Sequence, residues 1–170
     1  MTLTVGQSLI RVDAEAKVKG KAVYPGDIEM PDMAYMKILF ANHPHAIIQR
    51  IDVSRAEQLP GVLAVFTAKD VPNNEYGLIS PDQPVLCGPG SNKAHADHVR
   101  FIGDQVALVV AESEAIAVQA ISLIDVDYAD LPVVSDPREA MKVQSRRLFP
   151  DRDSNVFGHY RIRKGSIENG

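Results

Sequence analysis

The sequence predicts one globular domain that combines short strands with short helices and ends in a polar tail. Its 170 residues are enough to enclose one hydrophobic core, and they favour one domain over two. Its composition, 45% hydrophobic and 24% charged, is ordinary for a soluble globular protein. Apolar runs of strand length alternate with short helical segments bounded by capping residues. These observations together predict a fold that contains both kinds of element.

The N-terminal residues are predicted to form a short helix and a strand. Asp13 and Gly20 flank residues 14–19 as the N-cap and the C-terminal stop of a helix. A strand is expected at residues 21–24. Two turns that contain proline follow, at residues 25–27 and 31–32.

Three strands and one helix are predicted next. The apolar run at residues 33–41 is interpreted as a buried strand, and residues 46–53 as its neighbour in the sheet. Ser54 and Glu57 have the spacing of a capping box for the short helix that follows. After Pro-Gly ends that helix, residues 62–68 are predicted to form the next strand.

Residues 69–98 are predicted to form a long loop. They contain four prolines and three glycines and show no sustained hydrophobic period. Loops longer than about 12–15 residues are uncommon inside compact domains and usually bind something, cover something or move. This loop is therefore a candidate binding segment.

The stretch after the loop is predicted to be a β-hairpin and a helix. Residues 99–102 and 106–111 are apolar strands, and the Gly-Asp pair between them suits a tight turn. Ser113 is placed to cap a helix over residues 114–124. Because this helix has few polar residues, either it lies flat on its own sheet or its outer face also meets another chain.

The chain is predicted to close with a strand, a helix and a connector. Residues 125–134 are extended, and Asp136 with Pro137 opens a final helix. The charged residues that follow lack periodic apolar positions. The expected organisation is a single domain over residues 1–142 and an extended connector over residues 143–170.

Charge and targeting signals argue against nucleic acid and membranes as partners. The net charge is −4, with Lys and Arg scattered among acidic residues, so no broad positive field is expected. No apolar stretch approaches the roughly 20 residues that span a bilayer, and no secretory signal is evident. A single cysteine cannot form an internal disulfide. The expected location is the cytoplasm.

Candidate nucleophiles and acids are few. No glycine-rich loop lies between a strand and a helix, so nucleotide binding is not expected. Cys87 lies in the long loop without an evident base beside it, and we expect an idle thiol. Asp125 and Asp127 are expected to share one solvated face of a strand.

Four histidines form two short-spaced pairs, and imidazole is a common ligand of zinc and other transition metals. The favoured interpretation is that they are solvated or hydrogen-bonded residues of a turn and a loop. The alternative is a metal site that brings the two pairs together. No catalytic, cofactor-binding or metal-binding residue is assigned. The histidines concerned are His43, His45, His95 and His98.

Four stretches, in order and spacing, resemble the molybdenum hydroxylases. This family includes xanthine dehydrogenase, aldehyde oxidase and bacterial relatives such as carbon monoxide dehydrogenase and hydroxybenzoyl-CoA reductase. The resemblance runs from about residue 5 to residue 165. The stretches are RVDAEAKVKGKAVYPGDIEMPDMAYMKIL, HAIIQRIDVSRAEQLPGVLAVFTAKDVP, VRFIGDQVALVVAES and VDYADLPVVSDPREAM.

The resemblance implies the N-terminal α/β-hammerhead domain of the molybdenum-binding subunit, an α+β fold with a curved mixed sheet and a few packed helices. In the family the molybdopterin site and the catalytic glutamate lie beyond this domain, so no catalytic residue carries over and this chain alone is expected to bind no cofactor. The full enzyme would contain molybdopterin with molybdenum, iron-sulfur clusters and FAD. It would hydroxylate an aldehyde or an N-heterocycle. The turn at residues 41–46 and the Asp104-Gln105 pair depart from the family pattern and leave the substrate branch open.

Two functions follow as hypotheses. The first is an assembly domain, not catalytic alone, with a molybdopterin-binding region or subunit and iron-sulfur and FAD subunits or domains as partners; a homo-oligomer is also allowed. The chain would then be either a piece of a longer polypeptide or a separate subunit. The second is an autonomous small-molecule or metal-binding module that uses the 69–98 loop and its histidines.

Overall fold

The computed structural model describes residues 6–78 and 80–169, and the chain divides into two compact units. The first unit ends at Met33 and the second begins at Ala34. The boundary expected at residue 142 lies inside the second unit and stays a prediction. No helix among the described residues is long and apolar enough to cross a bilayer.

The first unit contains a short helix and irregular turns. Helix α1 (Ala14–Val18) forms as predicted, but the Asp13 side chain does not cap it, because its carboxylate binds Lys17 at 2.6 Å instead. The predicted strand at residues 21–24 is wrong. The amides of residues 21 and 22 donate to the carbonyl of Ala16 and so continue the end of the helix. The predicted turns are present, as a 3-10 turn at Pro25–Asp27 and a turn at residues 31–32.

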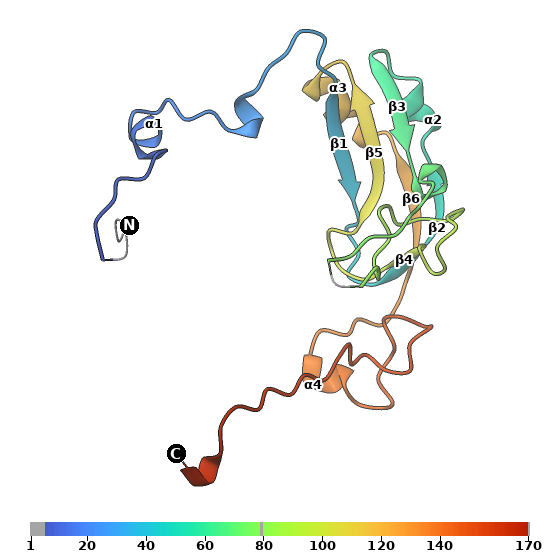
Figure 1. Cartoon of the computed structure of the whole chain (residues 1–170). Helices are drawn as coiled ribbons and strands as arrows, with labels where there is room; N and C mark the ends of the chain where they lie inside the picture. Colours follow the sequence, from blue (N-terminus) through green and yellow to red (C-terminus); the bar gives the residue numbers. More distant parts are fainter. Residues whose placement is uncertain (1–5, 79, 170) are drawn as a thin grey trace. The chain divides into compact units, whose positions relative to one another are not determined.

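Three antiparallel strands form the first sheet of the second unit, in the order β1-β5-β3 (Figure 1). The central strand, β5, is rich in valine, and it has apolar side chains on both faces of the sheet, which suits a strand paired on both sides. The strand predicted as buried is instead an edge strand, in which Met36 and Phe40 are half exposed. The strands are β1 (Tyr35–Phe40), β3 (Val62–Phe66) and β5 (Gln105–Ala111).

A second antiparallel sheet has the order β4-β2-β6. Because β1 and β2 lie in different sheets, the predicted pairing of residues 33–41 with residues 46–53 is wrong. The predicted hairpin is wrong for the same reason, since β4 pairs with β2 whereas β5 pairs with β1 and β3. The strands are β2 (Ala46–Asp52), β4 (His98–Val99) and β6 (Asp125–Asp130).

The predicted turn between β4 and β5 is present and carries the chain from one sheet to the other. Gly103 has φ of +111°, a conformation that favours glycine. The Asp104 carboxylate accepts the backbone amide of Arg100 at 2.6 Å and closes the turn.

The two sheets and the short helices together confirm the predicted α+β class. In detail, the strands form two small antiparallel sheets and not one curved mixed sheet.

Helix α3 (Glu114–Ile121) covers one face of the first sheet (Figure 1). The Ser113 hydroxyl accepts the amide of Ile116, which confirms the predicted N-cap. Lys37 of β1 pairs with Glu114 and lowers the pKa of that carboxyl by stabilising its charge. The helix lies on its own sheet, as the first of the two interpretations predicted. On the outer side of the helix, the Val118 side chain is 54% exposed.

The other helices are single turns. In α2 (Ser54–Glu57) the predicted capping box is wrong, because the Ser54 hydroxyl donates to Asp52 at 2.6 Å and the N-cap position is Val53. In α4 (Pro137–Ala140) the predicted cap is confirmed. The Asp136 carboxylate there accepts two amides of the first turn. Two further 3-10 turns occur at Ala68–Asp70 and Ile167–Asn169.

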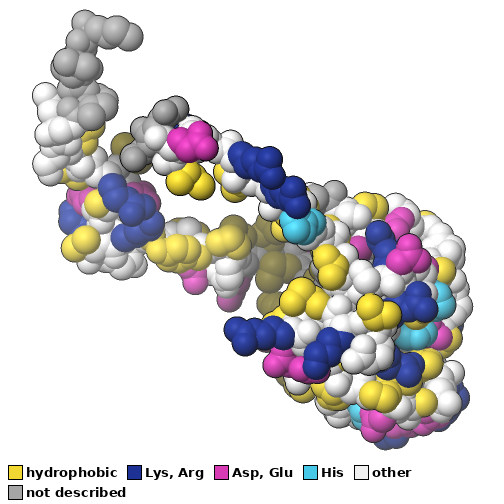
Figure 2. All heavy atoms as spheres, turned by 90° about the horizontal axis from the view of Figure 1, so that it is seen from below, with side chains coloured by type: hydrophobic (Ala, Val, Ile, Leu, Met, Phe, Trp, Pro, Cys, Tyr) yellow, Lys and Arg dark blue, Asp and Glu magenta, His cyan; other side chains and the backbone are white. Residues whose placement is uncertain are grey.

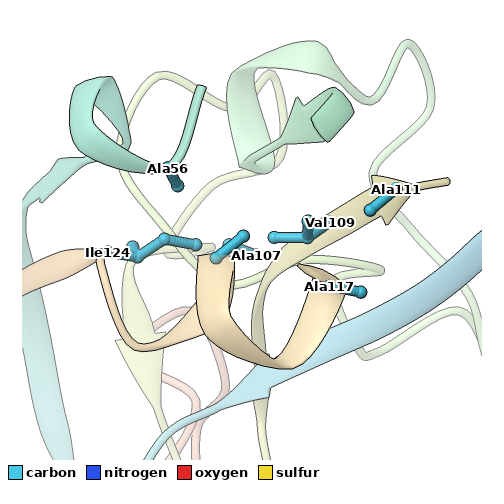
Figure 3. Close-up of a cluster of buried hydrophobic side chains, with 7 residues drawn as sticks. Ala56, Ala107, Val109, Ala111, Ala117 and Ile124 are labelled. Carbon is cyan, nitrogen blue, oxygen red and sulfur yellow. The ribbon is translucent and has the colours of Figure 1, made fainter. Parts of the chain in front are cut away.

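The core lies where α2 and α3 meet the first sheet (Figure 3). Its buried members are mostly alanines and valines, so the helices approach the strands closely. A second cluster lies under the long loop and includes Cys87 and Val106. Leu39, Ile51 and Val126 pack against both clusters and join them into one continuous interior. The labelled side chains in Figure 3 are Ala56, Ala107, Val109, Ala111, Ala117 and Ile124.

Candidate functional site

A buried asparagine joins distant parts of the long loop predicted at residues 69–98 to one another. Asn74 is fully buried, and its amide donates to the carbonyl of Leu86 and to the hydroxyl of Ser91, both at 2.8 Å. Its oxygen accepts the amide of Leu86 at 2.9 Å. Asn74 was not singled out from the sequence, because one polar residue in a proline-rich loop gives no periodic signal. These bonds cross-link the loop between residue 74 and residues 86 and 91.

The two histidine pairs have different surroundings. The His43 ring stacks on Tyr128 with a centroid distance of 4.1 Å, and its Nδ1 lies 2.7 Å from Asp130. His45 is buried, with Nδ1 2.7 Å from the carbonyl of Pro132. Both rings therefore have partners on β6 or just after it, as the favoured interpretation of hydrogen-bonded turn residues required.

The second pair lies close together with an acid between its members. Ligand atoms of His95, Asp97 and His98 all lie within 4.8 Å of one another. Among residues 6–78 and 80–169, this is the group of three potential metal ligands that the structure brings together. It includes neither His43 nor His45, so the alternative of one site that joins both pairs is wrong for the described chain. Asp97 was not predicted from the sequence as a ligand, because a single acid in a loop gives no periodic or spacing signal.

Cys87 is placed where a thiolate is disfavoured. The side chain is 1% exposed, and burial raises the pKa of its thiol to about 12. The nearby Asp104 carboxylate acts in the same direction. The thiol lies 3.8 Å from the carbonyl of His98, to which it is a weak donor. A nucleophilic role is not supported, in agreement with the expected idle thiol.

The acids Asp125 and Asp127 on β6 are neutralised by arginines. Asp127 accepts the Arg50 guanidinium of β2 at 2.8 Å, and Asp125 lies 3.5 Å from Arg55. The Asp127 carboxylate raises the pKa of Arg50 by stabilising its charge. Both acids are exposed, so the predicted solvated face is confirmed.

Arg100 ties the segment after α4 to the domain. Its guanidinium donates to the carbonyl of Leu148 at 3.0 Å and lies 4.5 Å from the centroid of the Phe149 ring. Burial lowers the pKa of Arg100. Asn155 then folds the segment on itself, because its side chain bonds the backbones of Leu148, Ala140 and Arg146. The start of the predicted connector is thus ordered in this structure.

Two cavities of about 290 and 280 Å³ lie where this segment meets the long loop. Leu148, Phe149 and Asp82 line both. The first adds Arg152 beside Asp153, and the second adds Arg100 beside Asp104, so each cation is accompanied by acids. A phosphate-bearing cofactor such as molybdopterin needs uncompensated donors. Neither cavity fits it, and no chemical step through that group is assigned to this chain.

The face of the first sheet opposite α3 is an open apolar surface, which we call the outer sheet face. The register places its six members on one side of β1, β5 and β3. Met36 is 57% exposed and Phe66 40% exposed, and the other four are half-buried. Exposed apolar surface of this kind is typical of sites that contact another protein, a membrane or a ligand. The members are Met36, Ile38, Ala64, Phe66, Leu108 and Val110.

Charged side chains form no extended patch of one sign on the face drawn in Figure 2. Lys and Arg are interspersed there with Asp and Glu and with apolar side chains. Such a surface gives no sustained attraction to a polyanion. The outer sheet face, which is apolar, is therefore the stronger candidate for a functional surface.

A family model described as "Aldehyde oxidase and xanthine dehydrogenase, a/b hammerhead domain" matches residues 19–132. The chain is 40% identical over 164 residues to a probable xanthine dehydrogenase subunit of Bacillus subtilis, and the match covers 96% of this chain and 21% of that protein. It is 36% identical over 155 residues to "Carbon monoxide dehydrogenase large chain" of Afipia carboxidovorans, covering 91% and 18% respectively. The chain thus spans about a fifth of the length of these curated relatives.

Solved structures give the same result. A copper- and molybdenum-containing carbon monoxide dehydrogenase superposes with a TM-score of 0.75 at 34% identity, over 94% of this chain and 20% of that one. The aldehyde oxidoreductase of Desulfovibrio gigas superposes with a TM-score of 0.72 at 34% identity, over 83% and 16%. The match extends over both sheets and is confined to a small part of each larger protein.

Proposed function

Because the chain belongs to the aldehyde oxidase and xanthine dehydrogenase family, through its α/β-hammerhead domain, we propose that it is an assembly domain of a molybdenum hydroxylase. The predicted resemblance and the predicted hammerhead fold are confirmed by the same matches. In this proposal the domain supplies no reacting group. Its contribution is a rigid surface on which a catalytic region packs.

The outer sheet face carries the proposal. It presents six apolar side chains that no helix or strand among residues 34–78 and 80–169 covers, whereas α3 covers the opposite face of the same sheet. Leaving such a face in water has a free-energy cost of roughly 25 cal/mol per Å² of apolar area, which packing against another apolar surface recovers. A molybdenum-bearing region is the partner that the family membership favours.

The rest of the enzyme is proposed from the relatives. One relative is named "Nicotinate dehydrogenase large molybdopterin subunit" and another "Xanthine dehydrogenase molybdenum-binding subunit". The complete enzyme would use molybdopterin with molybdenum, iron-sulfur clusters and FAD, all held outside this chain, to hydroxylate an aldehyde or an N-heterocycle. The cytoplasm is its proposed location.

The test is to purify the untagged full chain from extract of its source cells together with whatever binds it. Mass spectrometry then identifies the bound proteins, and elemental analysis measures molybdenum and iron. Wild-type chain should recover a molybdenum-bearing protein. A double variant, Met36→Asp with Phe66→Asp, buries two charges in the proposed interface and should reduce that recovery at least tenfold.

Val118→Asp is the matched control, because Val118 is 54% exposed and lies on α3, on the other side of the same sheet. It should leave recovery unchanged. If Val118→Asp loses recovery of the partner and the double variant does not, the interface lies on the outer side of α3, and the proposal is contradicted. Recovery of the bait alone from wild type would contradict the assembly role itself.

A further inference from the structure

Residues 95–98 bring two imidazoles and a carboxylate together on one short stretch of chain. The His95 and His98 rings are perpendicular, with centroids 5.2 Å apart. Asp97 Oδ1 lies 2.9 Å from His98 Nδ1. One ligand atom from each of the three residues lies within 4.8 Å of the other two. Neither the strand pairing nor the proposed assembly role uses these three side chains.

The backbone that carries these side chains is fixed from several directions. The carbonyl of Asp97 accepts the amide of Ile48 of β2 at 2.8 Å. The Arg100 guanidinium donates to the carbonyls of both histidines, at 3.2 Å to His95 and 3.1 Å to His98. It therefore holds the two imidazole-bearing residues in a fixed relation, with its own charge directed at carbonyl oxygens. Ligands on an anchored backbone lose little freedom when they bind an ion.

The backbone of His95 has an uncommon conformation that this arrangement maintains. Its φ is +56°, in the left-handed region, where non-glycine residues are uncommon. Its carbonyl also accepts the amide of His98, so the chain turns back and presents both rings on the same short turn. Residues kept in such conformations occur often at binding sites.

Exposure of the group suits a site that keeps contact with solvent. The side chain of His98 is 13% exposed and that of Asp97 is 38% exposed. The neighbours Ala96 and Val99 are buried, at 2% and 0% exposed. An ion bound here would rest on a packed floor and retain one side open to water.

We propose that His95, Asp97 and His98 form a site for Zn²⁺ or a similar divalent transition-metal ion, with water as the fourth ligand. Two imidazole nitrogens and one carboxylate oxygen are a set that such ions accept. Ligands about 2.1 Å from a tetrahedral ion lie about 3.4 Å apart, so side-chain rotations that move the ligand atoms by about 1 Å close the observed group around an ion. The ion would replace the contact between Asp97 and His98. This proposal does not depend on the assembly role.

The experiment is calorimetric titration of the untagged full chain with zinc chloride, together with Co²⁺ binding read by visible absorption. Wild type should bind one ion per chain, and Co²⁺ should give the absorption of a four-coordinate complex. His95→Ala, Asp97→Asn and His98→Ala should each weaken Zn²⁺ binding at least about tenfold, since even outer partners of metal ligands contribute that much.

His43→Ala is the matched control. It removes an imidazole that is paired with a carboxylate at 2.7 Å, as His98 is with Asp97 at 2.9 Å, but that belongs to no three-ligand group among the described residues. Zn²⁺ affinity should be unchanged in this variant. Thermal unfolding of every variant shows whether the fold is kept, and Asp97→Asn tests the site if His98→Ala does not fold.

Two results would overturn the proposal. One is the absence of stoichiometric Zn²⁺ binding by folded wild-type chain. The other is equal weakening by His43→Ala and by the three site variants, which would mean that imidazoles bind zinc independently of the site. Neither result bears on recovery of a molybdenum-bearing partner, so failure of this site and failure of the assembly role are distinguishable.

Discussion

Replacement of Asn74 by alanine should destabilise the protein by about 2–6 kcal/mol. Asn74 is 0% exposed and Leu86 is 3% exposed, and the asparagine side chain bonds both the N–H and the C=O of Leu86. Alanine leaves these two buried backbone groups without that partner. Each unsatisfied buried group costs about 1–3 kcal/mol, which gives the range stated. Against a total stability of about 5–15 kcal/mol, the loss is large.

The assay is urea unfolding followed by circular dichroism, with linear extrapolation to water. Asn92→Ala is the matched control in the same loop, because Asn92 is exposed and donates a single bond, to the carbonyl of Pro72 at 2.7 Å. That change should cost less than about 1.5 kcal/mol. Hydrogen exchange at the Leu86 amide should accelerate in Asn74→Ala and not in Asn92→Ala, whether the loop opens alone or with the whole domain.

The reasoning would be refuted by either of two results. The first is an Asn74→Ala variant no less stable than Asn92→Ala. The second is a Leu86 amide that exchanges as slowly in Asn74→Ala as in wild type. Both would mean that the long loop is fixed by contacts other than the asparagine bonds.

Three further outcomes are expected. Burial raises the pKa of the Cys87 thiol from 9.0 to about 12, so the folded protein should resist alkylation. Because the unfolded chain loses this proton first, the free energy of unfolding should fall by up to about 1.4 kcal/mol per pH unit as pH rises between those values. Urea titrations of Cys87→Ala should lack this slope. Ser113→Ala removes the acceptor of the Ile116 amide and should cost about 1 kcal/mol in thermal unfolding; an unchanged midpoint would contradict the capping role. Arg100→Ala releases the carbonyl of Leu148, so limited proteolysis should cut residues 143–157 faster while the core persists, and unchanged cutting would mean that Arg100 does not hold that segment.

Local sequence signals predicted elements better than they predicted pairing. The apolar runs that became β2, β3 and β5 were found because alternation and β-branched residues depend only on near neighbours. The partner of each strand was not found, because the pairing of β1 with β5 joins residues about seventy positions apart. The hairpin error followed from this limit, since the Gly-Asp turn is real and its two flanking strands separate into different sheets.

Capping was predictable only where no other partner competed. Ser113 and Asp136 cap their helices, as the sequence pattern indicated. Asp13 and Ser54 had the same residue types in the same pattern but bind Lys17 and Asp52 instead. The choice between a cap and a side-chain partner depends on distances that a sequence pattern does not contain.

The candidate site was predicted in part. The histidines of the 95–98 segment were identified because imidazole is a common metal ligand, whereas Asp97 could be recognised only in the structure, where its carboxylate lies close to both rings. The outer sheet face could not be recognised in advance. Met36 and Phe66 lie thirty residues apart and share a face only through their common neighbour, β5.

The order of the strands has a consequence for synthesis of the protein on the ribosome. None of the first three strands pairs with another of the three, because β1 and β3 each require β5, and β2 requires β4 and β6. A nascent chain in which residue 98 has not yet emerged therefore has none of these six strands paired, and the second sheet is incomplete until β6 emerges. The apolar segments of β1, β2 and β3 stay without strand partners during that interval, so we expect chaperones that bind extended apolar peptides to protect the growing chain.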